Sequence, residues 1–282
     1  MRAYSTPMQE RRVCAMRGSN TTRINMLRGT LAALGLKYAA ASISVLLQEA
    51  DKEGCTPVEL LLHVTQYETS QRLIKRKGRN YAAAHFPPSP KRLDEYDTSE
   101  LESGITPTQI AQLKDLSWAD SASNILFLGP PGLGKTTLAV ALGVEAVEGG
   151  YTVGFQRMSS LLDILSNAGV DRSSSFRLRK LKQCDVLIID ELGFCPITRE
   201  QANLFFSLIS DIHETTSIIM TTNKKVTEWA EFLGDNALAT ALLDRLLYNA
   251  RCFSLIGESY RMKHPRVPEG LPASAGEAGC DA

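Results

Sequence analysis

The stretch that decides the fold of this chain reads Gly129-Pro130-Pro131-Gly132-Leu133-Gly134-Lys135-Thr136. It matches the pattern G-x-x-x-x-G-K-[ST] in full, directly after an apolar run and directly before a stretch with helical spacing. The glycines allow the backbone to fold tightly around a phosphate, and the following helix presents its positive N-terminal end to the same group. A chance match in a chain of this length has a probability of roughly one in a hundred. The stretch therefore predicts a P-loop that binds a nucleoside triphosphate.

The predicted nucleotide-binding residues are this loop and Thr137, which follows it. Within the loop, Lys135 is expected to reach the β- and γ-phosphates and to take part in catalysis. Thr136 is expected to offer its hydroxyl to Mg²⁺. Mg²⁺ is therefore an expected cofactor beside the nucleotide.

A second apolar run, residues 186–189, ends in the acids Asp190 and Glu191. A carboxylate at the C-terminal end of a strand beside a P-loop can hold Mg²⁺ through its water shell, which is the role expected of Asp190. Glu191 then follows at the position of a general base that polarises the attacking water. Alone, this pattern is more often a strand that enters a polar turn. Together with the P-loop it predicts ATP hydrolysis.

The run 217–221 is followed closely by Asn223, whose neutral amide can orient a water molecule near the γ-phosphate. An Asn after a strand is also a common turn residue. The sequence from Asn223 reads N-K-K-V and so lacks the Asp of the guanine-reading pattern N-K-x-D. This difference favours adenine over guanine, and the expected cofactors are ATP and Mg²⁺.

Two arginines, Arg245 and Arg261, are candidates for neutralising negative charge on the γ-phosphate. An arginine finger in this role raises the rate of hydrolysis by ~10³–10⁵. The ordinary alternative for any single arginine is a surface salt bridge.

The second half of the chain alternates short apolar runs with helical stretches. The expected strands are residues 125–128, 151–155, 185–189, 217–221 and 252–256, and the expected helices are 135–148, 158–168, 199–213 and 237–250. Such alternation is typical of an α/β fold in which helices cover both faces of a parallel sheet. A shorter helix is expected after Thr106, which is followed by Pro107 and Gln109 in a capping-box pattern.

The first part of the chain predicts a small helical domain. Apolar residues fall near helical spacing over 27–47, and a second helix is expected to start at Thr56, with Glu59 completing a capping box. The F-P-P-S-P stretch at 86–90 cannot continue a helix. The predicted division is a loose leader, a basic helical domain, a linker, an ATPase domain and a disordered tail, at residues 1–26, 27–85, 86–104, 105–264 and 265–282.

Charge is unevenly distributed although the whole chain is neutral. Residues 1–92 carry 15 Lys and Arg against 6 Asp and Glu, and the remainder carries 16 against 25. Phosphate neutralisation explains such basic runs in a DNA-binding protein, and a solvated helix face is the plainer alternative. The candidate DNA contacts are Arg72, Lys75, Arg76, Lys77, Arg79, Arg177, Arg179 and Lys180.

Composition excludes other classes of protein. No apolar run approaches the ~18 residues that a membrane-spanning helix needs, and no apolar stretch follows the basic N-terminus as it does in a signal peptide. The six cysteines are scattered and do not form a zinc-binding or disulfide pattern. A cytoplasmic protein with reduced thiols is expected.

The combined motifs resemble those of the IstB-like ATP-binding proteins, the ATPase helpers of a transposase in one group of bacterial insertion sequences. More distantly, the chain is similar to DnaC-type helicase loaders. The resemblance covers roughly residues 27–264. It rests on the segments 125–142, 185–194, 221–229 and 238–263, of which the last is the most specific.

The resemblance implies an AAA+ P-loop NTPase with a five-stranded parallel sheet flanked by helices and a small all-helical N-terminal domain. It implies an ATP site between neighbouring subunits, where Arg245 acts in trans and Arg261 senses nucleotide within its own subunit. It also implies an ATP-dependent homo-oligomer on double-stranded DNA that recruits or activates the transposase. A helicase loader remains the main alternative. A small-molecule P-loop kinase is disfavoured, because Glu191 and Asn223 suit attack by water.

Overall fold

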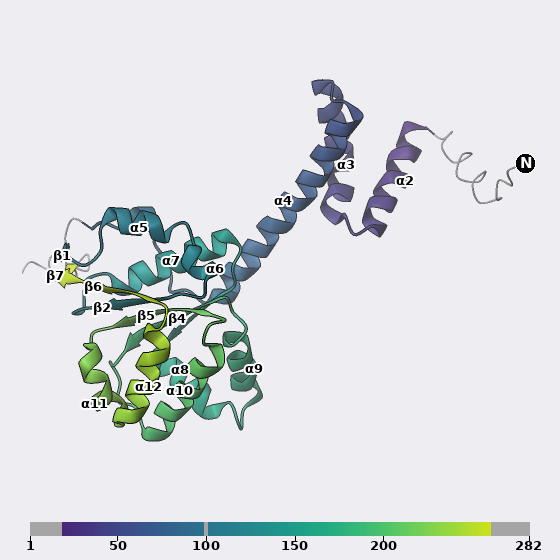
Figure 1. Cartoon of the computed structure of the whole chain (residues 1–282). Coiled ribbons are helices and arrows are strands. Elements are labelled where there is room, and N and C mark those ends of the chain that lie inside the picture. Colours follow the sequence, from purple (N-terminus) through teal and green to yellow (C-terminus); the bar gives the residue numbers. More distant parts are fainter. Residues whose placement is uncertain (1–18, 99–100, 261–282) are drawn as a thin grey trace, which may run out of the picture. The chain divides into compact units, whose positions relative to one another are not determined.

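The computed structural model describes residues 19–98 and 101–260. The chain forms two compact units, divided between Arg79 and Asn80, which we call unit 1 and unit 2 (Figure 1). None of the helices in the described residues is both long enough and apolar enough to cross a membrane.

Unit 1 consists of the helices α2 (Asn20–Ala33) and α3 (Lys37–Glu53) and most of α4 (Pro57–Ala84). The stretch 27–47, expected as one helix, is divided between α2 and α3 because Gly35 adopts a positive φ of 82°. Helix α2 begins within the predicted leader, where the Ser19 side chain caps it by accepting a hydrogen bond from the Thr22 amide. Residues 1–18 lie outside the described part of the chain.

The predicted start of α4 is confirmed. The Glu59 carboxylate accepts a hydrogen bond from the Thr56 amide at 2.7 Å, and the Glu59 amide donates to the Thr56 hydroxyl at 3.3 Å. These two bonds form the reciprocal capping box that the sequence predicts.

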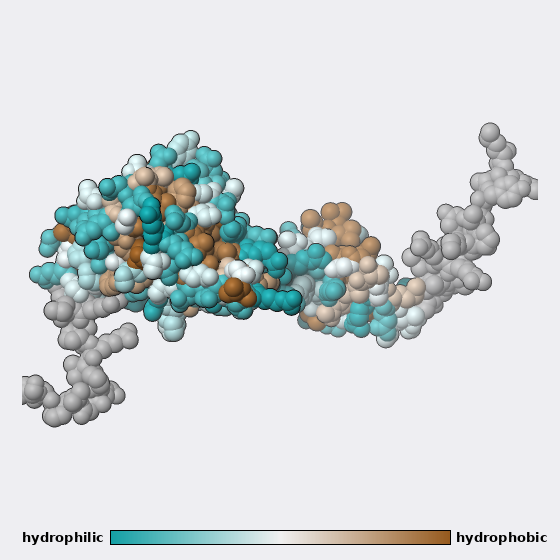
Figure 2. Space-filling model, turned by 90° about the horizontal axis from the view of Figure 1, so that it is seen from below, coloured by the Kyte–Doolittle hydropathy of each residue, from teal (hydrophilic) through white to brown (hydrophobic). Residues whose placement is uncertain are grey.

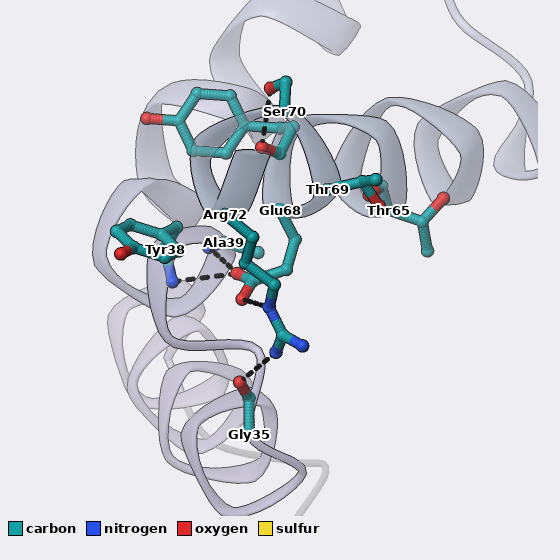
Figure 3. Close-up of polar contacts among 9 residues, drawn as sticks. Gly35, Tyr38, Ala39, Thr65, Glu68, Thr69, Ser70 and Arg72 are labelled. Atoms are coloured by element: carbon teal, nitrogen blue, oxygen red, sulfur yellow. Dashed lines mark hydrogen bonds and ion pairs between the residues drawn. The ribbon is translucent and has the colours of Figure 1, made fainter. Parts of the chain in front are cut away.

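A buried carboxylate joins α4 to the start of α3 (Figure 3). Glu68, only 2% exposed, accepts hydrogen bonds from the amides of Tyr38 and Ala39, both at 2.8 Å. Arg72 donates to the same carboxylate at 2.7 Å and to the Gly35 carbonyl at 2.5 Å. Burial raises the pKa of Glu68, but the bonds from Ala39, Arg72 and Tyr38 outweigh it and lower the pKa overall. Glu68 thus caps α3, whose own N-cap residue makes no side-chain bond.

Unit 2 contains a five-stranded sheet in which every neighbouring pair is parallel, in the order β3-β4-β5-β2-β6. This arrangement confirms the predicted α/β fold. The strands are β2 (Asn124–Leu128), β3 (Val153–Arg157), β4 (Val186–Leu192), β5 (Ser217–Thr222) and β6 (Ala250–Ser254).

Helices cover both faces of the sheet (Figure 1). One face packs against α5 (Pro107–Leu113), α6 (Ser117–Asp120) and α7 (Lys135–Gly149). The other face packs against α8 (Met158–Asn167), α9 (Arg172–Leu181), α10 (Arg199–Ile212), α11 (Trp229–Leu233) and α12 (Asn236–Leu247). Of the helices on the two faces, α6, α9 and α11 were not predicted. The capping box at Thr106 is present as predicted, with Gln109 as its partner.

Where the structure describes them, the residues of the predicted linker 86–104 belong to unit 2. Leu93, in the 3-10 helix η2 (Leu93–Glu95), is 2% exposed and lies in the same apolar core as Trp118 and Phe127. The chain then forms β1 (Leu101–Ser103), which pairs antiparallel with β7 (Ile256–Gly257). The run of prolines indicates where α4 ends. It does not predict the packing that follows, because single buried apolar residues leave no periodic pattern in the sequence.

Candidate functional site: a P-loop cavity

The predicted P-loop connects the end of β2 to the start of α7. Its glycines Gly129, Gly132 and Gly134 have φ angles of 143°, 89° and 75°. A Cβ atom on Gly129 would lie 2.3 Å from the Leu255 carbonyl oxygen, and one on Gly132 would lie 2.0 Å from the Ser259 Oγ. The loop therefore requires glycine both for its backbone angles and for the close packing of residues 255–259.

The loop borders a cavity of about 470 Å³, a volume typical of small-ligand sites. Several predicted residues line it: Pro131, Gly132, Leu133, Gly134, Lys135, Thr136, Thr137, Glu191 and Asn223. Gly129, Pro130 and Asp190 are not part of the lining. Gly129 and Pro130 act through their carbonyl oxygens, which accept hydrogen bonds from the Lys135 ammonium at 2.8 and 2.6 Å. These bonds hold the lysine at the start of α7, facing the cavity.

Asp190 lies beneath the cavity and is 1% exposed. Its Oδ1 accepts hydrogen bonds from the hydroxyls of Thr136, at 2.7 Å, and Thr221, at 2.6 Å. The structure thus brings together the two predicted metal ligands from β4 and α7. Their hard oxygen donors suit Mg²⁺, which is held through one or two carboxylates, water and substrate phosphates. Thr221 was not predicted, although it stands in an expected strand beside Asn223.

Glu191 follows Asp190 with a positive φ of 64°, which is unusual for a residue other than glycine. Its amide donates a hydrogen bond to the Thr221 hydroxyl at 3.0 Å. Its side chain is 45% exposed and lines the cavity, and its Oε2 lies 4.0 Å from the Arg157 Nε. The two acids therefore differ in environment: one is buried and hydrogen-bonded, whereas the other faces the ligand space. This is the difference that metal-holding and proton-accepting roles require.

Asn223 also lines the cavity. Within the described part of the chain, its buried Oδ1 has no hydrogen-bond partner. Buried polar atoms are nearly always satisfied, so this oxygen indicates a missing partner such as a water molecule or a ligand group.

One part of the cavity wall was not predicted from the sequence. Lys91, Glu95, Tyr96 and Leu101, all within the predicted linker, line this wall. The Tyr96 hydroxyl donates to the Leu133 carbonyl at 3.0 Å, and burial raises the pKa of Tyr96 to about 12, so the hydroxyl stays neutral. An aromatic ring and an aliphatic side chain at this wall provide a surface for a flat, apolar ring.

Arg245 is not among the residues that line this cavity. Arg245, on α12, donates to the Ala241 carbonyl at 3.0 Å, and its guanidinium lies 4.7 Å from the centre of the Phe206 ring. Arg261 falls outside the described residues.

The residues predicted to contact DNA differ in the groups that surround them. Arg72 is held by Glu68 and Gly35, which gives it a structural role, and Lys75 lies 5.9 Å from the Tyr38 ring centre. The other unit 1 candidates, Arg76, Lys77 and Arg79, lie further along α4. On α9 of unit 2, Arg177 and Lys180 line a second groove, and both Lys180 and Arg179 lie over the Phe176 ring, at 4.6 and 5.3 Å from its centre.

Residues 29–267 match the family of IstB-like ATP binding proteins. An ATP-binding protein of insertion sequence IS21 from Pseudomonas aeruginosa is 36% identical over 236 residues, which is 84% of this chain and 88% of that protein. An ATP-binding protein of insertion sequence IS5376 from Geobacillus stearothermophilus is 41% identical over 182 residues, 64% of this chain and 72% of that protein.

Two solved structures resemble a large part of this chain in fold. The match to DnaI has a TM-score of 0.52 at 17% identity and covers 61% of this chain and 95% of the DnaI chain. The second structure is the replication initiator DnaA bound to AMPPCP and single-stranded DNA. This match has a TM-score of 0.50 at 17% identity and covers 64% of this chain and 54% of the DnaA chain. With the P-loop, the parallel sheet and the family match together, the chain belongs to the IstB-like ATP-binding proteins and has an AAA+ P-loop fold.

Proposed function

We propose that the chain hydrolyses ATP, and the observation that carries this proposal is the grouping of Lys135, Thr136, Asp190, Glu191 and Asn223 at one cavity edge. Lys135 binds the phosphates, and Thr136 and Asp190 hold Mg²⁺, which neutralises charge on the phosphate oxygens. Asn223 orients a water molecule. Glu191 accepts a proton from that water. At the same time the water oxygen attacks the γ-phosphorus, and the bond from the γ-phosphorus to the β-phosphate breaks.

The wall formed by Tyr96 and Leu101 receives the adenine ring. This assignment extends the preference for ATP that the missing guanine-reading Asp suggests. It also gives a reason for the packing of Tyr96 against the P-loop, where its hydroxyl donates a hydrogen bond to the Leu133 carbonyl.

Arg245 completes a neighbouring subunit's site. In its own chain it lies over Phe206 and outside the cavity lining, which supports a role across a subunit interface. ATP binding then favours a homo-oligomer, because a γ-phosphate links the P-loop of one chain to the arginine of the next.

The biological role we propose is a cytoplasmic transposition helper that assembles on double-stranded DNA and recruits or activates a transposase. Support comes from relatives named after insertion sequences and from the basic residues of α4 and α9. Unit 1 also exposes apolar side chains early in α4, Val58, Leu61 and Leu62, at 68, 66 and 51%. Figure 2 shows apolar surface gathered on this unit, a feature of protein contact sites.

The test measures ATP turnover by the full chain alone, with duplex DNA, and with duplex DNA and an insertion-sequence transposase. We expect DNA to increase turnover and the transposase to bind the chain only with ATP and DNA. Turnover that responds to a replicative helicase and not to DNA or transposase would favour the helicase-loader alternative. Turnover only with a small metabolite would overturn both roles.

A further inference from the structure

The corner between α3 and α4 in unit 1 gathers three side chains of the kinds that bind metal ions (Figure 1). They are Glu53, the last residue of α3, Cys55 in the connection, and His63 on α4. One ligand atom from each lies within 4.8 Å of the other two: a carboxylate oxygen, the thiol sulfur and a ring nitrogen. Their spacing along the chain matches none of the usual zinc-binding patterns, so it is the fold that brings them together.

The distances between these atoms suit a zinc ion. Zinc binds sulfur at ~2.3 Å and nitrogen or oxygen at ~2.0–2.2 Å in a tetrahedral arrangement, which places its ligand atoms about 3.4–3.6 Å apart. The Cys55 Sγ already lies 3.7 Å from the Glu53 Oε2. Glu53 and His63 are exposed, so shifts of roughly 1 Å at their side-chain ends complete this geometry without moving the backbone.

The backbone around Cys55 is fixed from both sides. At the end of α3, Gly54 adopts a positive φ of 67°, and its amide donates to the Asp51 carbonyl at 3.3 Å. The Cys55 amide donates to the Ala50 carbonyl at 2.9 Å, which completes a Schellman motif. The next residue, Thr56, belongs to the capping box that starts α4. Cys55 is therefore held between two helix ends, and little ordering is needed for an ion to bind.

The charges around Cys55 favour a cation. Partial burial and the nearby carboxylates of Glu53 and Glu59 raise the pKa of the Cys55 thiol. Glu59 also lies close enough to His63 for the two side chains to attract each other. A thiolate beside two carboxylates is unfavourable alone, whereas a divalent ion offsets the repulsion and takes the thiolate as a ligand.

We propose that Glu53, Cys55 and His63 form a binding site for Zn²⁺ at the corner between α3 and α4. A thiolate, an imidazole and a carboxylate together suit this ion, whereas Mg²⁺ takes oxygen ligands. Binding releases the thiol proton to water. Three protein ligands leave the fourth position to a water molecule or to a ligand from outside unit 1. The inference goes beyond the proposed ATP hydrolysis, because it uses no residue of the P-loop cavity.

A bound ion links the end of α3 directly to the second turn of α4. The exposed apolar side chains Val58, Leu61 and Leu62 lie on these same first turns of α4. Because the three ligands are gathered only in the folded chain, the ion stabilises unit 1 in proportion to its concentration above the dissociation constant.

The test uses the full chain, freed of metal by a chelator and titrated with Co²⁺. This ion replaces Zn²⁺ in tetrahedral sites and absorbs visible light strongly when a thiolate binds it. Zn²⁺ is then added to displace it. The variants are Cys55→Ala, His63→Ala and Glu53→Gln. Cys252→Ala and His85→Ala are the matched controls, because both residues belong to unit 2. Far-UV circular dichroism verifies the folding of each variant.

The wild type is expected to bind a single Co²⁺ with a thiolate absorption band that Zn²⁺ removes. Cys55→Ala should lose this band. His63→Ala and Glu53→Gln should bind at least about tenfold more weakly, because loss of even an outer partner of a metal ligand costs ~10–100-fold in affinity. Both controls should bind as the wild type does. Zn²⁺ should also move the urea transition of the wild type to higher denaturant, but not that of His63→Ala.

A wild-type chain without the thiolate band would overturn the site, and so would a band that persists in Cys55→Ala. Equal Co²⁺ affinity in the wild type and His63→Ala would show binding by a thiol alone and would also overturn it. Loss of the band in Cys252→Ala would assign the ion to another cysteine and contradict the site.

Discussion

Unit 1 depends on one buried carboxylate, and replacing it is predicted to destabilise this unit alone. Glu68→Ala removes the acceptor of two amide hydrogen bonds at the start of α3 and the partner of Arg72. Loss of a helix cap costs ~0.5–2 kcal/mol, and a hydrogen bond to a charged group contributes ~1.5–3 kcal/mol. Because Arg72 is more than half exposed, its share is at the low end. We expect a total of about 2–4 kcal/mol.

The assay separates the two units by their chromophores. Both tryptophans, Trp118 and Trp229, belong to unit 2, so tryptophan fluorescence reports unfolding of that unit. Far-UV circular dichroism reports both units. In urea, Glu68→Ala is expected to move the transition seen only by circular dichroism to lower denaturant and to leave the fluorescence transition unchanged.

The stability of unit 1 is expected to depend on pH, and the direction of this dependence follows from the direction in which folding shifts the pKa of Glu68. The pKa of Glu68 is lower in the folded chain than its ordinary value of 4.5, so the carboxylate stabilises unit 1 above that pH. This contribution is lost as pH falls through the folded pKa. The stability difference between wild type and Glu68→Gln should therefore shrink in acid. An unchanged circular-dichroism transition in Glu68→Ala, or an equal shift in the fluorescence transition, would refute the capping role.

Three further variants test the site. Lys135→Ala is expected to abolish ATP binding, measured with a fluorescent ATP analogue; retained affinity would contradict phosphate contact by Lys135. Gly132→Ala places a methyl group 2.0 Å from the Ser259 Oγ at a φ of 89°, and should weaken ATP binding at least about tenfold, whereas strain-free binding would contradict the loop geometry. Arg245→Ala should bind ATP yet lose ~10³-fold or more in turnover, and recover activity when mixed with Lys135→Ala chains; failure to recover would leave the arginine without a role in trans.

The sheet and the P-loop could be predicted because their signals are local. Each expected strand is present, and the loop motif lies between β2 and α7 as predicted. Strand ends differ by a few residues. For example, β3 starts at Val153, two residues after the predicted start, because the Thr152 amide and hydroxyl bond to the Asp185 carboxylate. Contacts of this kind between distant segments leave the spacing of apolar residues unchanged, so that spacing does not predict where a strand begins or ends.

The missed features depend on residues far apart in the sequence. The Glu68 cap joins α4 to α3 across about thirty residues, and the basic composition of α4 gives no sign that Arg72 bonds to this carboxylate. Tyr96 lacks periodic neighbours, so its position against Leu133 follows only from the folded chain. The proximity of Arg157 to Glu191 requires the register of β3 against β4, which no local pattern encodes.

We propose above that Glu191 accepts the proton of the attacking water at this P-loop cavity. The most direct test is ATP turnover by wild type and Glu191→Gln, with Mg²⁺-dependent ATP binding measured on the same samples. Glutamine keeps the shape of the side chain, so binding should stay within about twofold while turnover falls by ~10²–10⁴. Turnover equal to that of the wild type would contradict the assignment.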